Sequence, residues 1–569
     1  MSDPKEPDPP EDEAGPGDGV DPKIKLAIIE AQQAVSSTEQ SALEDAAAPL
    51  EDDAQAWDDA FRRAEEAKAA AQKHAAAAAA QREEVFFSSV RNFAPFAIAA
   101  YCLALAALRL NFSPFLEVDE AEFVGRVDLR LIYDNAHPPL FNWLMRILLN
   151  LTGWSWADAT SILRFALLGG FHYLTWSAAS RVAGPRAGVA ALAVSAFCPQ
   201  IVWMSTHTLA HSIMVLAGAA AVLFCTLRAL KKPDWKSYAW LGLAMSLGAL
   251  AKFNFFLMLV PFFAAFALDR QGRRLFTQPF AWAAPAAFAA TSAPSLIAAA
   301  IYVEDSGARI GKLYQDNRFA FLDLPYVGVD GFLSLIVMTL AWAGLAGLIW
   351  LGARAYDLIQ GGGLADPSDD GPGGAPYSGA MIGRILERAL LGGLGLFAVL
   401  ILAGDVTKIE ERYLTPLLAL LPVYLAVRWP LTISARPVAL LAIVAYLAVF
   451  PGYWGYVTYG KHRFAIPYDA VAAQIRRQYP EALPLISPRH DDQANIVLAL
   501  GWPGATTPRY QPVENDALLV WRGRGVAPAS LEPQGFGPAS PITTVAVDYR
   551  NSSGREEVYS FQRYVRTAP

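Results

Sequence analysis

Long apolar runs occupy the middle of the chain, between residues 91 and 459, and short polar loops separate them. A helix needs about 20 apolar residues to cross the ~30 Å hydrocarbon core of a bilayer, and it satisfies its own backbone polar groups. The pattern predicts about 11 membrane-spanning helices. Their approximate bounds are 92–110, 160–180, 187–203, 208–229, 238–252, 253–268, 280–301, 331–353, 385–403, 413–428 and 437–455.

The segment 238–268 is the least regular of these runs, because Lys252 interrupts it. We interpret it as a hairpin of two helices, each about 22 Å long at 1.5 Å per residue. A single span would instead invert every later loop and move Arg270 and its neighbours to the other side of the membrane. The predicted topology therefore depends on this hairpin.

Basic residues set the orientation of the predicted helices, since Lys and Arg are enriched in cytoplasmic loops. If the N-terminus lies in the cytoplasm, every loop on that side is basic. These loops carry Arg181 and Arg186; Arg228, Lys231, Lys232 and Lys236; Arg270, Arg273 and Arg274; Arg354, Arg384 and Arg388; and Arg428 and Arg436. The C-terminal segment is then expected on the non-cytoplasmic side.

The two ends of the chain have the character of aqueous sequence. Residues 1–53 are rich in Pro, Asp, Glu and Ala, and we expect them to be disordered in the cytoplasm. Residues 54–90 are expected to form a cytoplasmic helix, since strong helix formers dominate there. Up to residue 84, Trp57 and Phe61 are its bulky apolar residues, so this helix is expected to be marginal alone or to need a cytoplasmic partner. The polar start predicts no cleavable signal peptide.

Residues 460–569 predict a small soluble domain of α/β or α+β type. A helical pattern at 468–478 precedes the apolar segment 482–487, and a second helical stretch precedes the strand-like segments 516–521 and 543–549. Such mixtures pack as a sheet with helices on one or both faces. We interpret the charged run 487–492 as a polar loop of this domain.

The composition agrees with a polytopic membrane protein. Of the 569 residues, 54% are hydrophobic and 17% are charged, whereas soluble domains are about one quarter charged. The formal net charge of −7 combines acidic and basic regions that are separate in the sequence. No segment is both basic and aromatic enough to predict nucleic-acid binding.

The first non-cytoplasmic loop, 111–158, is too long for a simple connector. Its apolar residues recur at helical spacing, which predicts one or two amphipathic helices in the plane of the membrane interface. Asp119 and Glu120 stand near its start, and a His137-Pro138-Pro139 turn precedes its second helical part.

Further polar residues fall on the same predicted face. They are His207, Lys252, Asn254, Lys408, Arg412 and Tyr413. Taken singly, each has an ordinary explanation, because an Asp-Glu pair often caps a helix and a lysine can reach the lipid headgroups. Charges at membrane depth are costly, however, and usually face a cavity or a partner. Their convergence on one face favours a functional site.

Five segments together resemble a known family. They are VDEAEF (118–123), AHPPLFNWL (136–144), THTLAHS (206–212), LAKFNFFL (250–257) and KIEERYLTPLL (408–418). In their order and shared face the chain resembles the C-type membrane glycosyltransferases. Within them it is similar to bacterial glycosyltransferase family 39, which is related to protein O-mannosyltransferases and lipid A aminoarabinose transferases.

This resemblance implies a multi-pass enzyme of the bacterial inner membrane with a periplasmic C-terminal domain. Such an enzyme transfers a sugar from a polyprenyl-phosphate carrier to a periplasmic glycolipid, polysaccharide or protein. Physical reasoning supports that donor class, because nucleotide sugars are made in the cytoplasm and an outward-facing transferase needs a donor that crosses the bilayer.

The resemblance also implies roles for individual residues. Asp119 matches the catalytic aspartate, which acts as general base in an inverting displacement. Glu120 belongs to the same catalytic group, where we expect it to be a structural partner of Asp119. The donor phosphate would be bound by Lys252, Arg412 and Tyr413, with His137 and Lys408 as weaker candidates. His207, Asn254 and Asn135 would line the acceptor site or cavity. Ala136 replaces an acidic residue that relatives often carry, so we expect no metal and no other cofactor.

Two other functions stay open from the sequence. A transporter or flippase would also be polytopic, but transporters tend to show internal repeats and broken helices near the midplane. No convincing repeat is present. A polysaccharide polymerase or ligase is the second alternative, since the acceptor leaves no recognisable mark in the sequence.

Overall fold

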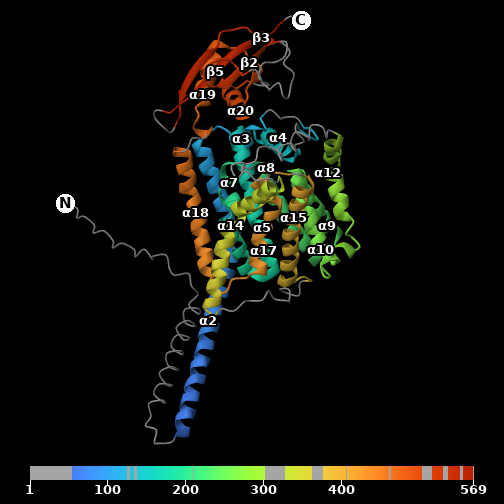
Figure 1. Ribbon diagram of the computed structural model, residues 1–569, viewed down its shortest axis with the longest axis vertical. Helices are drawn as coiled ribbons and strands as arrows, with labels where there is room; N and C mark the ends of the chain where they lie inside the picture. Colours follow the sequence, from blue (N-terminus) through green and yellow to red (C-terminus); the bar gives the residue numbers. More distant parts are fainter. Residues whose placement is uncertain are drawn as a thin grey trace, which may run out of the picture. The chain divides into compact units, whose positions relative to one another are not determined.

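The computed structural model describes most of the chain from residue 54 onward (Figure 1). The described residues are 54–124, 129–133, 138–208, 210–301, 327–361, 376–404, 406–459, 463–502, 516–528, 536–550 and 555–567. The predicted tail 1–53 and the candidate residues Asn135 and His137 lie outside them. The chain divides into two compact units, Met1–Ser88 and Ser89–Pro569, and the fold below concerns the second.

Helices make up the part of the chain that precedes the C-terminal domain. They are α2 (Ala54–Phe112), α3 (Val118–Ala121), α4 (Leu140–Thr152), α5 (Trp156–Ala196), α6 (Pro199–Val202), α7 (Met204–His207), α8 (Ala210–Lys231), α9 (Trp235–Ala249), η1 (Phe253–Phe255), α10 (Phe256–Leu268), α11 (Arg274–Thr277), α12 (Ala283–Ile301), α14 (Val327–Ile359), α15 (Gly379–Gly404), α16 (Glu411–Leu418), α17 (Leu421–Arg428) and α18 (Ala435–Tyr459).

Among the described residues, six helices are long and apolar enough to cross a membrane by themselves. They are Val85–Phe112 within α2, then α8, α12, Val329–Ile359 within α14, α15 and α18. A seventh span results if α5 is counted together with α6 and α7, which are bent from it by 84°. The other predicted spans appear as kinked or short helices. The chain is therefore a polytopic helical membrane protein, and the predicted number of 11 spans is not confirmed.

Three predicted boundaries differ from the observed helices. Helix α2 is one continuous helix of 59 residues, so no break separates the predicted cytoplasmic helix from the first span. The predicted spans 160–180 and 187–203 join in α5, which is kinked where Gly184 adopts a φ of +82° before Pro185. The predicted span 413–428 is divided into α16 and α17.

The hairpin predicted around Lys252 is present. Helix α9 ends before Lys252, and η1 and α10 follow it. The hydroxyl of Tyr238, near the start of α9, donates a 2.7 Å hydrogen bond to the carbonyl of Leu275 beyond the end of α10. The chain therefore returns to the end from which α9 started. The turn needs Gly248, since a Cβ there would lie 2.2 Å from the ring of Phe255.

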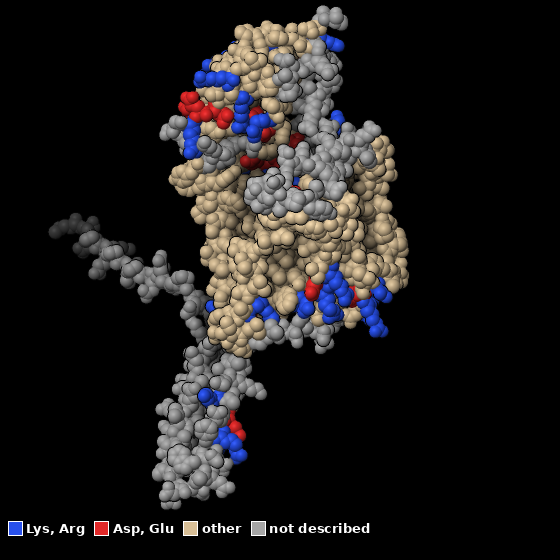
Figure 2. Space-filling view, in the orientation of Figure 1, with Lys and Arg blue, Asp and Glu red and all other residues tan. Residues whose placement is uncertain are grey.

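Helices α3 and α4 lie in the first loop, where the amphipathic pattern predicts one or two helices. Helix α4 buries Phe141 and Met145 on one face, and Gly153 ends it with a φ of +66°. Both helices lie at the end of the helix bundle that carries the C-terminal domain (Figure 1). Figure 2 shows Lys and Arg side chains gathered at the opposite end of the bundle.

The C-terminal domain is of mixed α and β type, as predicted. Its elements are η5 (Arg463–Ala465), α19 (Tyr468–Gln478), β1 (Leu485–Ile486), α20 (His490–Leu500), β2 (Asp516–Arg522), β3 (Phe536–Pro538), β4 (Thr543–Asp548) and β5 (Glu556–Arg566). Strand β5 lies at the centre of the sheet. It pairs antiparallel with β2 on one edge and with β3 and β4 on the other, while β1 extends the sheet parallel to β2.

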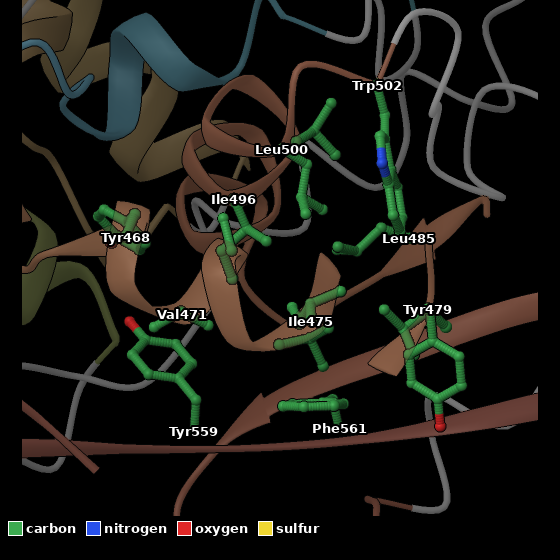
Figure 3. Packing of buried hydrophobic residues seen from close by; sticks show 14 of the residues in the cluster. Tyr468, Val471, Ile475, Tyr479, Leu485, Ile496, Leu500, Trp502, Tyr559 and Phe561 are labelled. Atoms are coloured by element: carbon green, nitrogen blue, oxygen red, sulfur yellow. The ribbon is translucent and has the colours of Figure 1, made fainter. Parts of the chain in front are cut away.

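Apolar side chains of α19 and α20 pack on one face of this sheet (Figure 3). Val471 and Ile475 of α19 face Tyr559 and Phe561 of β5, and all four are buried. The same cluster contains Phe115 from the first loop. The domain core is therefore completed by a residue from the segment that precedes α3.

Candidate active site

Asp119 is the second residue of α3 and is half-buried. A capping box fixes the start of this short helix, since the Glu117 side chain accepts from backbone N–H groups and Glu120 accepts from the Glu117 N–H at 2.9 Å. The box satisfies donors that the first turn of a helix otherwise leaves without partners. The capping box therefore fixes the backbone both before and after Asp119, at Glu117 and at Glu120.

Glu120 is fully buried between two arginines. Its carboxylate forms ion pairs with Arg109 at 3.0 Å and with Arg164 at 2.8 Å, and all three side chains have no exposed surface. Burial raises the pKa of the Glu120 carboxyl, but the charges of Arg164 and Arg109 lower it more, so that it lies below its ordinary value. Both oxygens of the Glu120 carboxylate are bound by arginines of the protein, so Glu120 holds the segment that carries Asp119 in place.

The two arginines join the first loop to the membrane helices. Arg109, near the end of α2, also donates to the carbonyls of Ser113 and Phe115, at 2.7 Å each. Arg164, in α5, donates to the carbonyl of Thr206 in α7 at 3.1 Å. Neither arginine was predicted from the sequence to belong to the site. Arg164 interrupts the predicted span 160–180, and a charge within a span could have indicated a functional or structural partner.

A second charged cluster precedes and begins α16. Glu410 forms ion pairs with Lys408 at 3.3 Å and with Arg412 at 2.5 Å. The exposed fractions of these side chains are 21% for Lys408, 14% for Glu410 and 41% for Arg412. This cluster is therefore partly open, and its two cations outnumber its one carboxylate.

Electrostatics link Asp119 to this second cluster. Burial lowers the pKa of Arg412, but the negative charge of Glu410 and, among smaller contributions, that of Asp119 raise it more. The net effect is a raised pKa, which keeps the guanidinium charged. The predicted base and a predicted phosphate-binding cation are thus close enough for their charges to interact.

The hairpin turn contacts the start of α16. The side-chain amide of Asn254 donates to the backbone carbonyls of Arg412 and Tyr413, at 3.3 Å each. The ammonium of Lys252, two residues earlier, donates to the hydroxyl of Ser212 in α8 at 3.0 Å. Segments about 160 residues apart in the sequence, as the hydrogen-bond partners show, are therefore brought together as predicted from their shared face.

The histidines of the 206–212 segment are packed among aromatic rings. His207 is 5% exposed and contacts Tyr456, with 4.9 Å between ring centroids, and Trp203, at 5.4 Å. His211 contacts Phe123 at 4.6 Å. The structure thus places His207 in a buried aromatic cluster, next to Thr206, whose carbonyl accepts from Arg164.

In the described part of the chain, the positive charges of this site come from Lys and Arg side chains. Among the residues described, no group of three or more His, Cys, Asp or Glu side chains is placed to hold a metal ion.

Comparisons with known proteins agree on the class of enzyme. The family model described as dolichyl-phosphate-mannose-protein mannosyltransferase matches residues 136–297. The lipopolysaccharide core galacturonosyltransferase RgtA of Rhizobium johnstonii is 26% identical over 492 residues, which cover 79% of this chain and 91% of the relative. The chain is a membrane glycosyltransferase, similar to these relatives. RgtB of the same organism is 27% identical to this glycosyltransferase over 335 residues, 58% of this chain and 64% of that one.

A solved structure supports the fold of this glycosyltransferase. ArnT from Cupriavidus metallidurans bound to undecaprenyl phosphate superposes with a TM-score of 0.51 and 15% sequence identity, covering 82% of this chain and 97% of ArnT. The same protein in the apo state gives a TM-score of 0.50. At this identity the match concerns the fold alone, and the roles of residues rest on the geometry above.

Proposed function

We propose that this glycosyltransferase moves a sugar from a polyprenyl-phosphate carrier to an acceptor hydroxyl on the periplasmic face of the bacterial inner membrane. One observation carries the proposal. The charge of Asp119 acts on Arg412, whose segment is bound by Asn254 of the hairpin turn. A carboxylate suited to take up a proton is therefore within electrostatic range of a partly open group of cations suited to hold a phosphate.

In this proposal Asp119 is the general base. The acceptor oxygen attacks the anomeric carbon from the face opposite the phosphate, while the Asp119 carboxylate takes the proton of that hydroxyl. The glycosidic bond forms as the bond from the anomeric carbon to the phosphate oxygen breaks, so the anomeric centre is inverted. A positioned base contributes roughly 10²–10⁴-fold to such a step.

The cations would stabilise the leaving group. As the bond to the sugar breaks, polyprenyl phosphate gains negative charge, which preorganised cations stabilise more in the transition state than in the ground state. Arg412 is the principal candidate, since its side chain is 41% exposed and a guanidinium can form two parallel hydrogen bonds with a phosphate. Lys252 and Lys408 add positive charge from the hairpin turn and from the segment before α16, and Tyr413 adds a hydroxyl donor.

The relatives suggest the class of acceptor. RgtA and RgtB are named for transfer to the lipopolysaccharide core, and ArnT was solved bound to undecaprenyl phosphate. A periplasmic glycolipid is therefore the acceptor we favour over a polysaccharide or a protein. The gathering of Lys and Arg at the end of the bundle away from α3 and α4 supports a cytoplasmic N-terminus and a periplasmic C-terminal domain.

The test is Asp119→Asn in proteoliposomes that contain a polyprenyl-phosphate sugar and a lipopolysaccharide-type acceptor. We expect sugar transfer to fall by about 10²–10⁴-fold, while insertion and thermal unfolding stay unchanged, because asparagine has the same shape but is no base. Asp158→Asn is the matched control, since that carboxylate lies in the first turn of α5 and accepts from the hydroxyl of the N-cap residue Ser155. Transfer at the native rate in Asp119→Asn would remove the proposed base.

A further inference from the structure

A helix of the C-terminal domain binds the segment that carries Asp119. Asn495 of α20 is fully buried, and its side-chain amide pairs with the backbone of Leu116. Its oxygen accepts from the Leu116 N–H at 2.7 Å, and its nitrogen donates to the Leu116 carbonyl at 2.9 Å. One amide thus satisfies both polar backbone groups of a residue three positions before Asp119.

Apolar contacts surround this pair. Phe115 is 6% exposed and lies in the domain core, with its ring centroid 5.2 Å from that of Tyr468. Leu116 packs with Ala494 of α20 and with Ala121 at the end of α3. The contact with the domain therefore extends on both sides of Asp119 in the sequence.

The membrane helices hold the same segment from the other side. Arg109 of α2 donates to the Phe115 carbonyl at 2.7 Å and binds Glu120 at 3.0 Å. Asp119 thus stands on a short segment fixed by two arginines of the helix bundle and by α20 of the domain. Without the contacts from α20, residues 113–117 would be held by the hydrogen bonds to Arg109 and by the capping box.

We infer that the C-terminal domain is part of the catalytic apparatus, and that Asn495 is a positioning residue that sets where the Asp119 carboxylate stands. This inference rests on the proposed role of Asp119 as general base. The expected size of the effect follows from geometry, because a displacement of about 1 Å in a reacting group can cost on the order of 100-fold in rate. The acceptor and the donor need not touch Asn495 for it to matter.

The decisive variants change the amide of Asn495 in the full-length protein. Asn495→Ala removes both bonds to Leu116, so kcat should fall by about 10- to 100-fold, while the affinity for polyprenyl phosphate stays near the native value. Asn495→Asp gives a test that depends on pH. A protonated carboxyl both donates and accepts, as the amide does, whereas an ionised carboxylate only accepts and would repel the Leu116 carbonyl.

Burial raises the pKa of such a carboxyl. Glu117 follows Leu116 in the sequence and Asp491 lies one turn before Asn495 on α20, and their negative charges would add to that shift. Arg109, which binds the Phe115 carbonyl, and Arg550, which lies over the Phe115 ring, oppose it. At about pH 8 the Asn495→Asp variant should therefore be as slow as Asn495→Ala. At about pH 5 its kcat, divided by the native kcat at the same pH, should recover several-fold.

Gln493→Ala is the control on the same helix. Its buried side-chain amide donates to the carbonyl of Leu485 within the domain, so its loss should lower the domain's stability and leave kcat unchanged. Equal losses of kcat in Gln493→Ala and Asn495→Ala would reduce Asn495 to a stabilising residue. A kcat ratio for Asn495→Asp that does not change with pH would overturn the inference.

Hydrogen exchange separates this inference from the proposed function. Asn495→Ala should speed exchange of the amides in 115–121 without speeding it in β5. If Asp119→Asn kept full activity while Asn495→Ala still showed this local change and a loss of kcat, the base would be wrong and the positioning of the segment would stand. Native exchange in Asn495→Ala would refute the positioning itself.

Discussion

Two clusters, around Glu120 and around Glu410, carry the same charges but differ in their exposure to solvent. In one, Glu120 lies between Arg109 and Arg164, and no side chain is exposed. In the other, Glu410 lies between Lys408 and Arg412, and all three side chains keep some exposed surface. Each consists of one carboxylate and two cations, so composition alone does not distinguish structure from binding.

The two clusters differ in whether their cations can exchange the carboxylate partner for a phosphate. In a fully buried cluster every charge depends on its partners, since an unpaired charge away from water is very unfavourable. In a half-exposed cluster water and ions screen the pairs, which are then worth only about 0.2–1 kcal/mol. An incoming phosphate can therefore take over the cations of the second cluster, but hardly those of the first.

The largest effect should come from Glu120→Gln. This change leaves two buried arginines with a neutral partner, and breaking a buried pair costs about 3–5 kcal/mol. We expect a large loss of thermal stability in detergent, measured by the unfolding of the purified protein. Native stability in this variant would mean that the two clusters do not differ as described.

The same variant has a pH signature. The folded-state pKa of Glu120 is lowered, so its stabilising effect is complete above the ordinary glutamate pKa of about 4.3 and is lost as the pH falls through the folded pKa. The stability gap between the native protein and Glu120→Gln should therefore be constant between about pH 6 and 8 and shrink in strong acid.

The next effect should come from Arg412→Ala. Removing one preorganised donor to a developing charge costs about 10²–10³-fold in turnover, while stability should barely change because the ion pair is partly exposed. Arg428→Ala is the matched control, since Arg428 pairs with Glu387 at 2.9 Å and is similarly exposed, at 31%. Equal turnover in the two variants would argue against a phosphate site at Arg412.

The smallest effect should come from Glu410→Gln. Burial raises the pKa of Glu410, but Arg412 and Lys408 lower it more, so it is below its ordinary value and the group is ionised at neutral pH. This carboxylate competes with a phosphate for both cations. Its neutral replacement should tighten polyprenyl-phosphate binding by roughly two- to fivefold, measured as product inhibition. Weaker binding would show that Glu410 orders the cations rather than competing for them.

Much of the membrane part could be predicted because hydropathy reports burial in lipid directly. The hairpin at Lys252 and the amphipathic α4 follow from run length and periodicity. Kinks and continuity were harder to predict, since the change from polar to apolar composition along residues 54–112 does not interrupt α2. The segments that carry Asn254 and Arg412 came together as predicted, but the Arg109 and Arg164 pairing with Glu120 needed the tertiary structure.

The C-terminal domain shows a second limit of sequence patterns. The run 487–492 was predicted as a polar loop, yet His490 begins α20 and Asp492 is 2% exposed on its side chain. Asp492 accepts from the hydroxyls of Tyr468 at 2.8 Å and Tyr559 at 3.2 Å and pairs with Arg522. Because these partners are distant in the sequence, the sequence alone does not show whether such a carboxylate is buried or exposed to water. Strand β5 was missed because residues on both of its faces are buried, which hides the alternation of a strand.

The hydrogen bonds of Asn254 have a consequence for how such an enzyme can evolve. Asn254 binds the main-chain carbonyls at positions 412 and 413, not their side chains. A contact of that kind survives when either side chain is exchanged. A lineage could therefore alter the chemical character of positions 412 and 413, to suit a different lipid-linked donor, while the hairpin turn and α16 keep their attachment.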